Sequence, residues 1–131
     1  MTTTVDDDAR RAFMERFFES IGTDGYHSTY YHDDAVVEFP QSGERFEGVE
    51  NFRAWREQYP ADVAFRTRRL TGSGDVWVGE CWVSYDGGPE MMGFAVHELR
   101  GDRIARERIY VVEPWEAPEW RAPWRAATPA E

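Results

Sequence analysis

The chain is short, acidic and rich in aromatic residues. Its 131 residues are enough for one domain with a single core, and contents of 41% hydrophobic and 15% aromatic residues are too apolar for a disordered chain. The net charge of −10 disfavours nucleic acids and anionic membranes as partners, because both bind to basic surfaces.

The residue types exclude one class of covalent catalysis and indicate the cellular compartment. All 15 basic residues are arginines, so no lysine is present to form a Schiff base with a substrate. Cys81 is the single cysteine and cannot form an internal disulfide. No apolar leader opens the chain, and no apolar stretch approaches the length of about 18 residues that a membrane span needs. We therefore expect a cytoplasmic protein without a membrane-spanning segment.

The first 22 residues predict a helix. Thr4 and the acidic residues at positions 6–8 are typical of a helix start, and Gly22 is typical of a helix end. The buried face is expected to carry three residues at i, i+4 and i+8 spacing, namely Phe13, Phe17 and Ile21.

Residues 24–59 predict a helix, a strand and a second helix in turn. The short helix covers residues 24–31, and the strand covers residues 36–39 and ends before Pro40. A loop that contains glycine then leads to a helix over residues 49–59. The aromatic residues that this helix presents are Phe52, Trp55 and Tyr59.

The second half of the chain predicts an antiparallel meander. Its four β-rich runs are separated by Gly-containing turn signals and cover residues 62–71, 75–86, 90–100 and 103–113. Helices followed by a curled sheet indicate an α+β domain in which the helices cover one face of the sheet. Residues 114–131 are rich in Pro and Trp and cannot form one regular element, because Pro breaks both helix and strand.

This order of elements resembles the NTF2-like superfamily, and in particular its SnoaL-like branch. The residues that carry the resemblance are the run DDAVVEFP in the predicted strand and NFRAW in the following helix. The resemblance covers residues 8–113 of a single domain, 1–131, and leaves residues 114–131 as a tail. It implies a cone-shaped fold in which a curved antiparallel sheet surrounds a pocket that the first helices close.

The resemblance leaves the activity open. Members of the superfamily include ketosteroid isomerases, polyketide cyclases, epoxide hydrolases, dehydratases and non-enzymatic transport or association modules, so the fold does not determine the function. Phe39 stands where the isomerases have their general base, and the position of their oxyanion-hole tyrosine falls near Glu15. Their second acid falls on His97, and the aspartate of the cyclases falls on Ile109. The Asp–Arg–Asp arrangement of the epoxide hydrolases is not recognisable either. Steroid-type isomerisation in its usual form is therefore rejected.

The alternation of side chains along strands predicts which residues share the pocket. Glu80 and Trp82 lie on one face of their strand. A simple turn at Gly87-Gly88 places Ala95 opposite Glu80, so that Glu80 and His97 become diagonal neighbours. The resemblance makes this face the inner one.

The last strand allows two registers. A two-residue turn at Gly101-Asp102 places Arg106 and Arg108 beside His97. The register that the resemblance implies needs a β-bulge near the turn instead. It turns inward Glu107, Ile109 and Val111. We favour the second register, because burying aliphatic side chains costs less than burying two guanidinium groups.

The predicted catalytic residues are therefore Glu80, His97 and Glu107. A histidine between carboxylates is suited to act as acid or base near neutral pH. The residues expected to bind the ligand are Phe39, Trp55, Trp82, Tyr30 and Ile109. The alternative is a structural network in which Glu80 and Glu107 pair with neighbouring arginines.

Other polar residues have simpler expected roles. The run His32, Asp33 and Asp34 is assigned to capping and solvation, because contiguous residues rarely converge on one metal ion; no metal site and no cofactor is predicted. Glu38 is expected to point away from the pocket, toward Arg45 or solvent. His27 is expected at the surface.

Two surfaces are expected to take part in packing or assembly. The predicted outer sheet face carries Trp77, Cys81, Val83 and Tyr85, and through it the fold is expected to form a homodimer. The tryptophans of the tail are expected to pack across the domain or onto a partner subunit, because three exposed indoles favour aggregation. They are Trp115, Trp120 and Trp124.

Two functions follow from these observations. The first is a cofactor-independent enzyme that performs acid–base isomerisation, cyclisation, dehydration or hydrolysis on a small, mostly apolar molecule. The second is a non-catalytic module that binds an apolar ligand or associates with a protein partner. A pocket filled by the protein's own side chains would exclude the first function, and turnover of a lactone, epoxide or enone would exclude the second.

Overall fold

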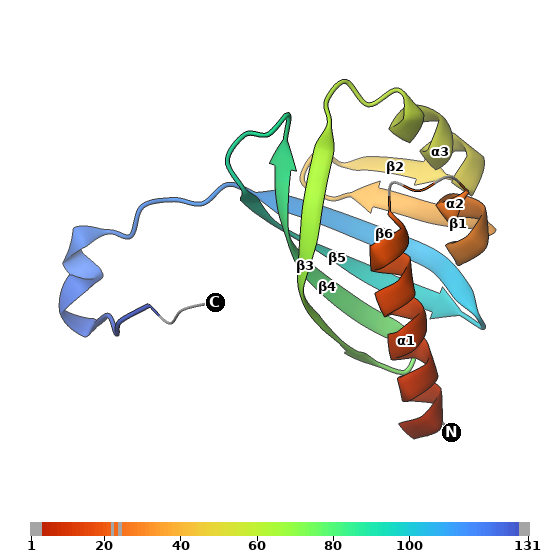
Figure 1. The fold of residues 1–131 in the computed structure, drawn as a ribbon, viewed down its shortest axis with the longest axis horizontal. Coiled ribbons are helices and arrows are strands. Elements are labelled where there is room, and N and C mark those ends of the chain that lie inside the picture. The colour runs from red at the N-terminus through yellow and green to blue at the C-terminus, as the bar shows by residue number, and fades with distance from the viewer. Residues whose placement is uncertain (1–3, 22, 24, 129–131) are drawn as a thin grey trace.

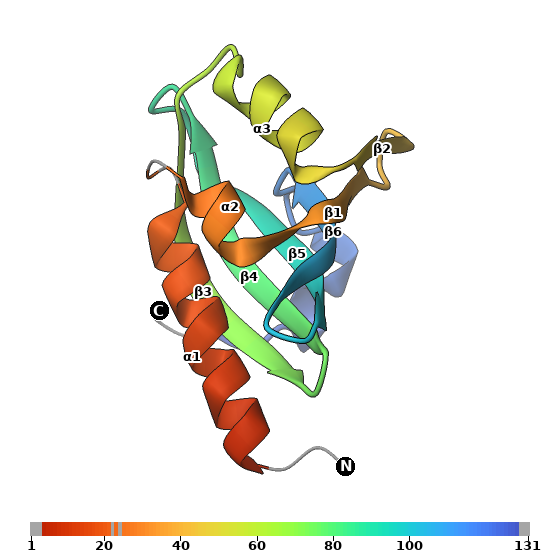
Figure 2. The same ribbon diagram turned by 90° about the vertical axis from the view of Figure 1, so that its right-hand side faces the viewer.

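Three helices lie over one face of a curved, six-stranded sheet (Figures 1 and 2). The computed structural model describes residues 4–21, 23 and 25–128. The helices are α1 (Thr4–Ser20), α2 (Tyr26–Tyr30) and α3 (Val49–Glu57), and a 3₁₀ helix η1 (Glu119–Trp124) follows the sheet. The strands are β1 (Tyr31–Phe39), β2 (Glu44–Glu47), β3 (Val63–Ser73), β4 (Val76–Tyr85), β5 (Met91–Arg100) and β6 (Arg103–Val112). The predicted α+β architecture is confirmed.

The sheet combines the predicted meander with an N-terminal hairpin. Its order is β2-β1-β6-β5-β4-β3, in which β3 to β6 form the antiparallel meander. Strand β1 pairs in parallel with β6, and β2 pairs antiparallel with β1. Strand β2 was not predicted, and β1 begins at Tyr31 instead of residue 36. The expected boundary residues Gly22 and Asp24 lie outside the described residues.

The core forms between the helices and the inner face of the sheet. Phe17 and Phe52, from α1 and α3, are fully buried there together with Tyr31 and Trp77 of the sheet. Phe18 of α1 packs directly on β4 at Gly79, where an added Cβ would lie 2.1 Å from the Phe18 Cζ atom. The missing side chain at Gly79 therefore allows α1 to approach the sheet closely.

The register between β4 and β5 differs from the predicted one. His97 pairs with Trp77, and Glu80 pairs with Phe94, so the pairing is shifted by one residue. The tight turn lies at Asp86-Gly87, where both residues have positive φ (52° and 70°), and the amide of Gly88 donates to the carbonyl of Tyr85. A shift of one residue moves side chains to the opposite face relative to their neighbours.

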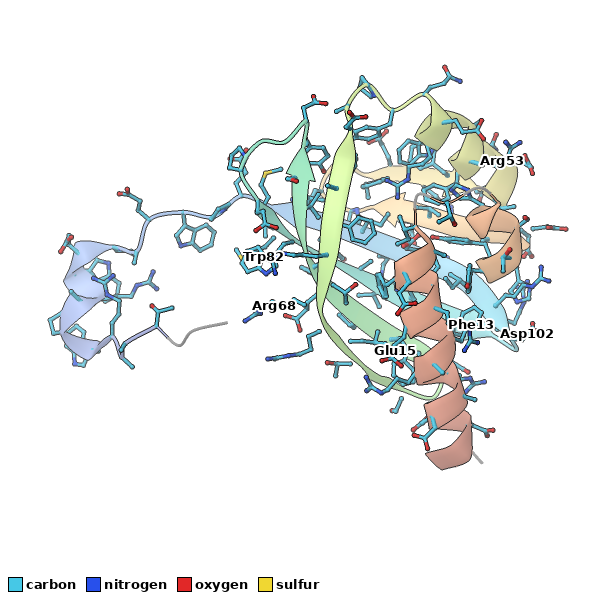
Figure 3. The ribbon with its side chains drawn as sticks, in the orientation of Figure 1. Phe13, Glu15, Arg53, Arg68, Trp82 and Asp102 are labelled. Carbon is cyan, nitrogen blue, oxygen red and sulfur yellow. The ribbon has the colours of Figure 1, made fainter. Side chains whose placement is uncertain are left out.

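The faces of β4 are therefore the reverse of those predicted. Glu80 and Trp82 lie on the outer face, where Arg68 is placed 3.7 Å from the Glu80 carboxylate and 6.0 Å from the Trp82 ring centroid (Figure 3). The residues expected on the outer face belong instead to the inner face, and they are Trp77, Cys81, Val83 and Tyr85. The placement of these four residues on the outer face and the predicted pocket role of Glu80 and Trp82 were wrong for this reason. A homodimer through the outer face stays a prediction.

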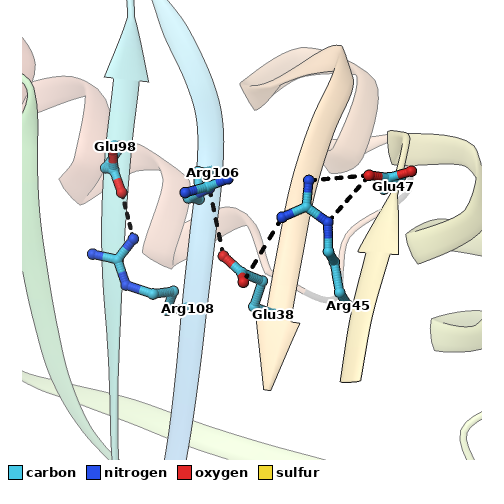
Figure 4. Close-up of polar contacts among 6 residues, drawn as sticks. All are labelled: Glu38, Arg45, Glu47, Glu98, Arg106 and Arg108. Atoms are coloured by element: carbon cyan, nitrogen blue, oxygen red, sulfur yellow. Dashed lines mark hydrogen bonds and ion pairs between the residues drawn. The ribbon is translucent and has the colours of Figure 1, made fainter. Parts of the chain in front are cut away.

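The register of β6 is the one implied by the resemblance. His97 pairs with Glu107, and the predicted bulge lies in β6 at Ala105, where the pairing passes from Glu98–Arg106 to Leu99–Ile104. Arg106 and Arg108 consequently lie on the outer face, in ion pairs with Glu38 and Glu98 (Figure 4).

Glu38 lies on the outer face as expected. Its carboxylate is 3.4 Å from the Arg106 guanidinium and 3.9 Å from that of Arg45, which also binds Glu47 (Figure 4). The acidic and basic side chains of this surface therefore neutralise each other, and no net charged patch arises from them.

The C-terminal segment extends away from the sheet after β6 (Figure 1). Its three tryptophans are 82%, 71% and 79% exposed, so the expectation that they pack across the domain was wrong. Packing onto a partner subunit stays a prediction. Within the described part of the chain, no helix is both long and apolar enough to cross a membrane.

Candidate functional site

A buried carboxylate on β6 is held by two hydrogen bonds from other strands. The Tyr31 hydroxyl of β1 donates to Oε1 of Glu107 at 2.6 Å, and Nε2 of His97 on β5 lies 2.7 Å from Oε2. Glu107 is 5% exposed, and His97 is fully buried. Both carboxylate oxygens therefore have a partner, as a buried carboxylate requires.

The ionisation of Glu107 is set by opposing effects. Burial acts to raise its pKa, because a charged carboxylate loses hydration. The charge and hydrogen bond of His97, the Tyr31 hydroxyl and the charge of Arg56 act in the other direction. Their sum lowers the pKa of Glu107 below its usual 4.5, so the carboxylate is ionised at neutral pH.

His97 is enclosed by aromatic rings of α1. Phe17 and Phe18 present their edges to the imidazole, with ring centroids 5.2 and 5.5 Å away. The Nδ1 atom is buried and has no hydrogen-bond partner among the residues that the structure describes. His97 therefore supports Glu107 from behind, and only Glu107 of the pair lines a cavity.

The inner cavity lies between α1, α3 and the concave face of the sheet, and it has a volume of about 110 Å³. Six of the side chains that line it are Phe39, Trp55, Phe65, Cys81, Val83 and Ile109. Among the described residues that line it, only Glu107 and Arg56 carry a charge at neutral pH. The protein's own side chains leave this cavity open, so the first predicted function is not excluded.

A wider space, here called the vestibule, lies next to the inner cavity. It has a volume of about 860 Å³ and lies between α1, the residues before β3 and β3 itself. The two spaces are adjacent, because both are lined by Phe18, Ile21, Arg56, Tyr59, Val63 and Phe65. Its acidic residues are Glu15, Glu19 and Asp62.

The structure brings together some of the predicted site residues and separates others. His97 and Glu107 are in contact, and Phe39, Trp55 and Ile109 line the inner cavity. Tyr30 does not line it, because its ring packs against Phe13 and Phe17 of α1.

Tyr31 is the site residue that the sequence interpretation missed. It was assigned to the preceding helix, whereas the structure places it at the start of β1. Alternation along the strand does not lead to it, because Asp33 is exposed and the pairing with β6 is irregular between Tyr31 and Val36.

Two further expectations about single residues were wrong. His27 is 6% exposed and packs its ring against Phe52, with centroids 5.1 Å apart. Cys81 lines the inner cavity instead of the outer face, and burial raises its pKa to about 11. The thiol is therefore protonated at neutral pH and is a weak nucleophile.

The polar run at residues 32–34 contacts Arg100. A ring nitrogen of His32 lies 2.5 Å from the Arg100 carbonyl oxygen, and Asp34 pairs with the Arg100 guanidinium at 2.7 Å. These contacts tie the start of β1 to the end of β5, in agreement with a structural role for this run.

Comparison with known proteins agrees with this fold. An NTF2-like protein of unknown function from Burkholderia xenovorans LB400 is 31% identical, with a TM-score of 0.82 over 91% of this chain and 94% of that one. A candidate ketosteroid isomerase from Kribbella flavida is 22% identical, with a TM-score of 0.84 over 96% and 94% of the two chains.

More distant structures share the fold alone. A candidate polyketide cyclase from Sinorhizobium meliloti is 23% identical, with a TM-score of 0.65 over 76% of this chain and 94% of that one. None of the curated proteins matches the sequence. The family model of the SnoaL-like domain matches residues 11–107, which include all three members of the Tyr31–Glu107–His97 group. The chain therefore belongs to the SnoaL-like domain family of NTF2-like proteins.

Proposed function

We propose that this protein is a cofactor-independent acid–base catalyst that acts on a small, mostly apolar molecule in the inner cavity. One observation carries the proposal: an ionised carboxylate, Glu107, borders an otherwise largely apolar cavity and is fixed by Tyr31 and His97. A carboxylate needed only for folding would gain nothing from a cavity in front of it.

Glu107 is the group that exchanges a proton with the substrate. Its lowered pKa keeps it in the base form at neutral pH, and its position at the cavity allows contact with a bound molecule. His97 and Tyr31 orient the carboxylate. They also remain next to the side chain of Glu107 when it is protonated, so that it keeps hydrogen-bond partners. This refines the expectation that His97 itself is the acid or base.

The proposal is tested by turnover of a panel of ketones, enones, lactones and epoxides. The Glu107→Gln variant keeps the size of the side chain and removes its base, so the rate is expected to fall by a factor of about 10²–10⁴. The matched control is Glu98→Gln, on the outer face of the neighbouring strand, which should leave the rate unchanged.

The alternative is a binding module without catalysis. Wild-type protein that binds small apolar molecules in the cavity but turns over no member of the panel would contradict the enzymatic proposal and support this alternative. The buried Tyr31–Glu107–His97 group would then be a structural network, as the sequence also allowed. The cytoplasmic location expected from the sequence stays part of the proposal.

A further inference from the structure

The vestibule carries an excess of acidic groups. Of the described side chains around it, Glu15, Glu19 and Asp62 are acidic, whereas Arg56 is the single basic one. Glu15, which is labelled in Figure 3, and Glu19 lie one turn apart on α1 and share one face of the helix. Within the described part of the chain, none of the three carboxylates forms an ion pair with an arginine. Their charges are therefore available to a basic partner.

The rest of the vestibule wall is largely apolar. Phe18 and Ile21 of α1 line it together with Tyr59 and with Val63 and Phe65 of β3. Tyr59 and Val63 are each 37% exposed, so large apolar side chains of this wall are partly open to solvent. A space with apolar walls and carboxylates suits a partner that carries aromatic and basic side chains together.

The chain has such a partner in its own tail. Residues 120–125, WRAPWR, contain two Trp-Arg pairs and no acidic residue, although the whole chain has a net charge of −10. We call these residues the Trp-Arg segment. Both of its indoles are among the most exposed apolar side chains described. The Arg121 guanidinium lies 5.6 Å from the ring centroid of its neighbour Trp120, and neither Arg121 nor Arg125 binds a carboxylate among the described residues.

The outer face of the sheet offers the tail no comparable site. Its arginines and glutamates already neutralise each other in four pairs, which are Arg66–Glu90, Arg68–Glu80, Arg106–Glu38 and Arg108–Glu98. These four carboxylates are engaged, whereas the three of the vestibule are not. Charge complementarity therefore directs the Trp-Arg segment to a vestibule.

The direction of the tail indicates whose vestibule it meets. After β6 the tail extends away from the sheet, and in Figure 1 it lies to the left of the sheet while α1 lies to the right. An arm that leaves its own domain with exposed indoles is suited to cover a second copy of the chain. In a symmetric dimer each copy would cover the other in the same way.

We infer that the Trp-Arg segment of one copy docks into the vestibule of a second copy. Arg121 and Arg125 pair with Glu15 and Glu19, and the two indoles cover the apolar wall that the vestibule shares with the inner cavity. The tail of one copy thereby forms part of the enclosure around the ligand site of the other. The inference goes beyond the proposed function and holds whether or not the cavity is catalytic.

Mixing two forms of the whole chain tests the inference by NMR at sub-millimolar concentration. One form carries a nitroxide spin label at Ala126→Cys, in a Cys81→Ser background so that the natural thiol is not labelled. The other form is the wild type enriched in ¹⁵N. We expect the nitroxide to broaden amide resonances of residues 15–21 and 61–65 in the ¹⁵N-enriched copy, because a nitroxide relaxes only nearby nuclei. Chemical reduction of the nitroxide should restore them.

Reversal of charge identifies the contact. Glu15→Arg/Glu19→Arg in the ¹⁵N-enriched copy should weaken docking at least about tenfold and remove the broadening. Asp8→Arg, on the same helix but outside the vestibule, is the control and should retain it. Adding Arg121→Glu/Arg125→Glu to the spin-labelled copy should restore broadening in the reversed vestibule. The same tail variant should lose it against the wild-type vestibule, which keeps the test valid if the helix variant does not fold.

The indoles are tested in the same mixture. Trp120→Ser/Trp124→Ser should lose the broadening, and Trp115→Ser, which lies outside the Trp-Arg segment, should retain it. Absence of broadening in the wild-type mixture would overturn the inference. Broadening at Met92 and Phe94 of the outer face instead of the vestibule would overturn it as well. Vestibule broadening that occurs only when the label and ¹⁵N are on the same chain would show that the tail folds back onto its own copy, and would overturn the exchange between copies.

Discussion

A carboxylate that is 5% exposed is costly to bury, and Glu107 is stabilised by partners on two other strands. Replacing one partner leaves one carboxylate oxygen without its hydrogen bond, so part of the free-energy cost of burying the charge is no longer offset. The free energy of the site is therefore sensitive to single atoms, such as the hydroxyl oxygen of Tyr31.

Tyr31→Phe should destabilise the fold and raise the pKa of Glu107. The substitution removes one hydrogen bond to an ionised group, which is worth about 1.5–3 kcal/mol. Loss of the same bond removes an effect that lowers the pKa of Glu107. Urea unfolding and carboxyl ¹³C NMR titration measure the two changes.

Tyr30→Phe is the control for this substitution. Tyr30 is adjacent in sequence, and its ring packs against Phe13 and Phe17, so loss of its hydroxyl should change neither quantity appreciably. Equal effects of the two substitutions would show that the hydroxyl of Tyr31 does not support the Glu107 carboxylate.

His27 should make the protein less stable as the solution becomes mildly acidic. Its pKa is lowered from 6.5, first by burial and then by the positive charges of Arg56 and Arg53. The unfolded chain therefore binds the proton at a higher pH than the folded chain. Stability falls as pH decreases from 6.5 to the lower folded-state pKa, and this group has no effect well above 6.5.

The measurement is urea unfolding between about pH 7.5 and pH 5, where His27→Gln should have a smaller slope than the wild type. Glu107 contributes only at lower pH. Its pKa is lowered from 4.5, so its stabilisation is complete above that value and is lost as pH falls through the folded-state pKa. An unchanged slope in His27→Gln would contradict the assignment.

At the scale of elements, the cavity depends on how closely α1 approaches β4. Phe18 packs on the bare backbone of Gly79, and the same ring borders both the inner cavity and His97. The position of one helix therefore sets the size of the cavity and the enclosure of the polar group behind it.

Gly79→Ala should displace Phe18 and reduce ligand binding. The new Cβ would lie 2.1 Å from the ring, so the ring or the helix must move, at a cost of about 1–3 kcal/mol. Thermal unfolding and titration with acetophenone, a small aromatic ketone, check both effects. The double variant Gly79→Ala/Phe18→Leu should recover part of the lost stability, because a smaller side chain leaves room for the methyl group. Wild-type stability and binding in Gly79→Ala would contradict this packing argument.

At the scale of the whole molecule, the two faces of the sheet have different roles. The inner face carries the core, the cavity and the polar group, whereas the outer face carries paired charges and several exposed apolar side chains. Among these, Met92 is 41% exposed, and Phe94 stacks on Tyr110 with ring centroids 4.6 Å apart. Such a surface suits contact with a second copy of the chain.

We predict a homodimer through this outer face. Met92→Glu would bury a charge at the interface and should shift wild-type dimers to monomers at micromolar concentration, as measured by sedimentation velocity. Ala54→Glu, on exposed α3 over the opposite face, is the control and should remain dimeric. Removal of residues 114–131 should weaken the dimer if the exposed tryptophans contact the partner subunit. A wild type that sediments only as a monomer would refute the prediction.

Much of the fold was predictable because its signals are local. Turn residues separate the four strands of the meander, and the register that the family resemblance implied for β6 placed Glu107 and Ile109 on the inner face. The preference for burying aliphatic side chains over guanidinium groups selected the correct register of this strand. These inferences need only neighbouring residues, the cost of burial and, for β6, the register that the resemblance implied.

The incorrect register predicted for the β4–β5 hairpin shows what signals between neighbouring residues do not determine. The run Asp86-Gly87-Gly88 allows more than one tight turn, and the positive φ of Asp86 selects the one that pairs His97 with Trp77. This choice moved Glu80 out of the predicted site. It depends on how the whole sheet packs against α1, which no short stretch of sequence encodes.

By itself the sequence determined the α+β class, the meander, the family resemblance and an inward-facing carboxylate on the last strand. Only the tertiary structure decided what surrounds that carboxylate. Tyr31 and Glu107 are 76 positions apart, and they meet because β1 lies parallel to β6. Arg56 lines the same cavity from α3, which belongs to the helices over the sheet. The physical reason is that periodicity and turn residues act between neighbours, whereas a site is assembled by long-range pairing and packing, in which a shift of one residue exchanges the two faces of a strand.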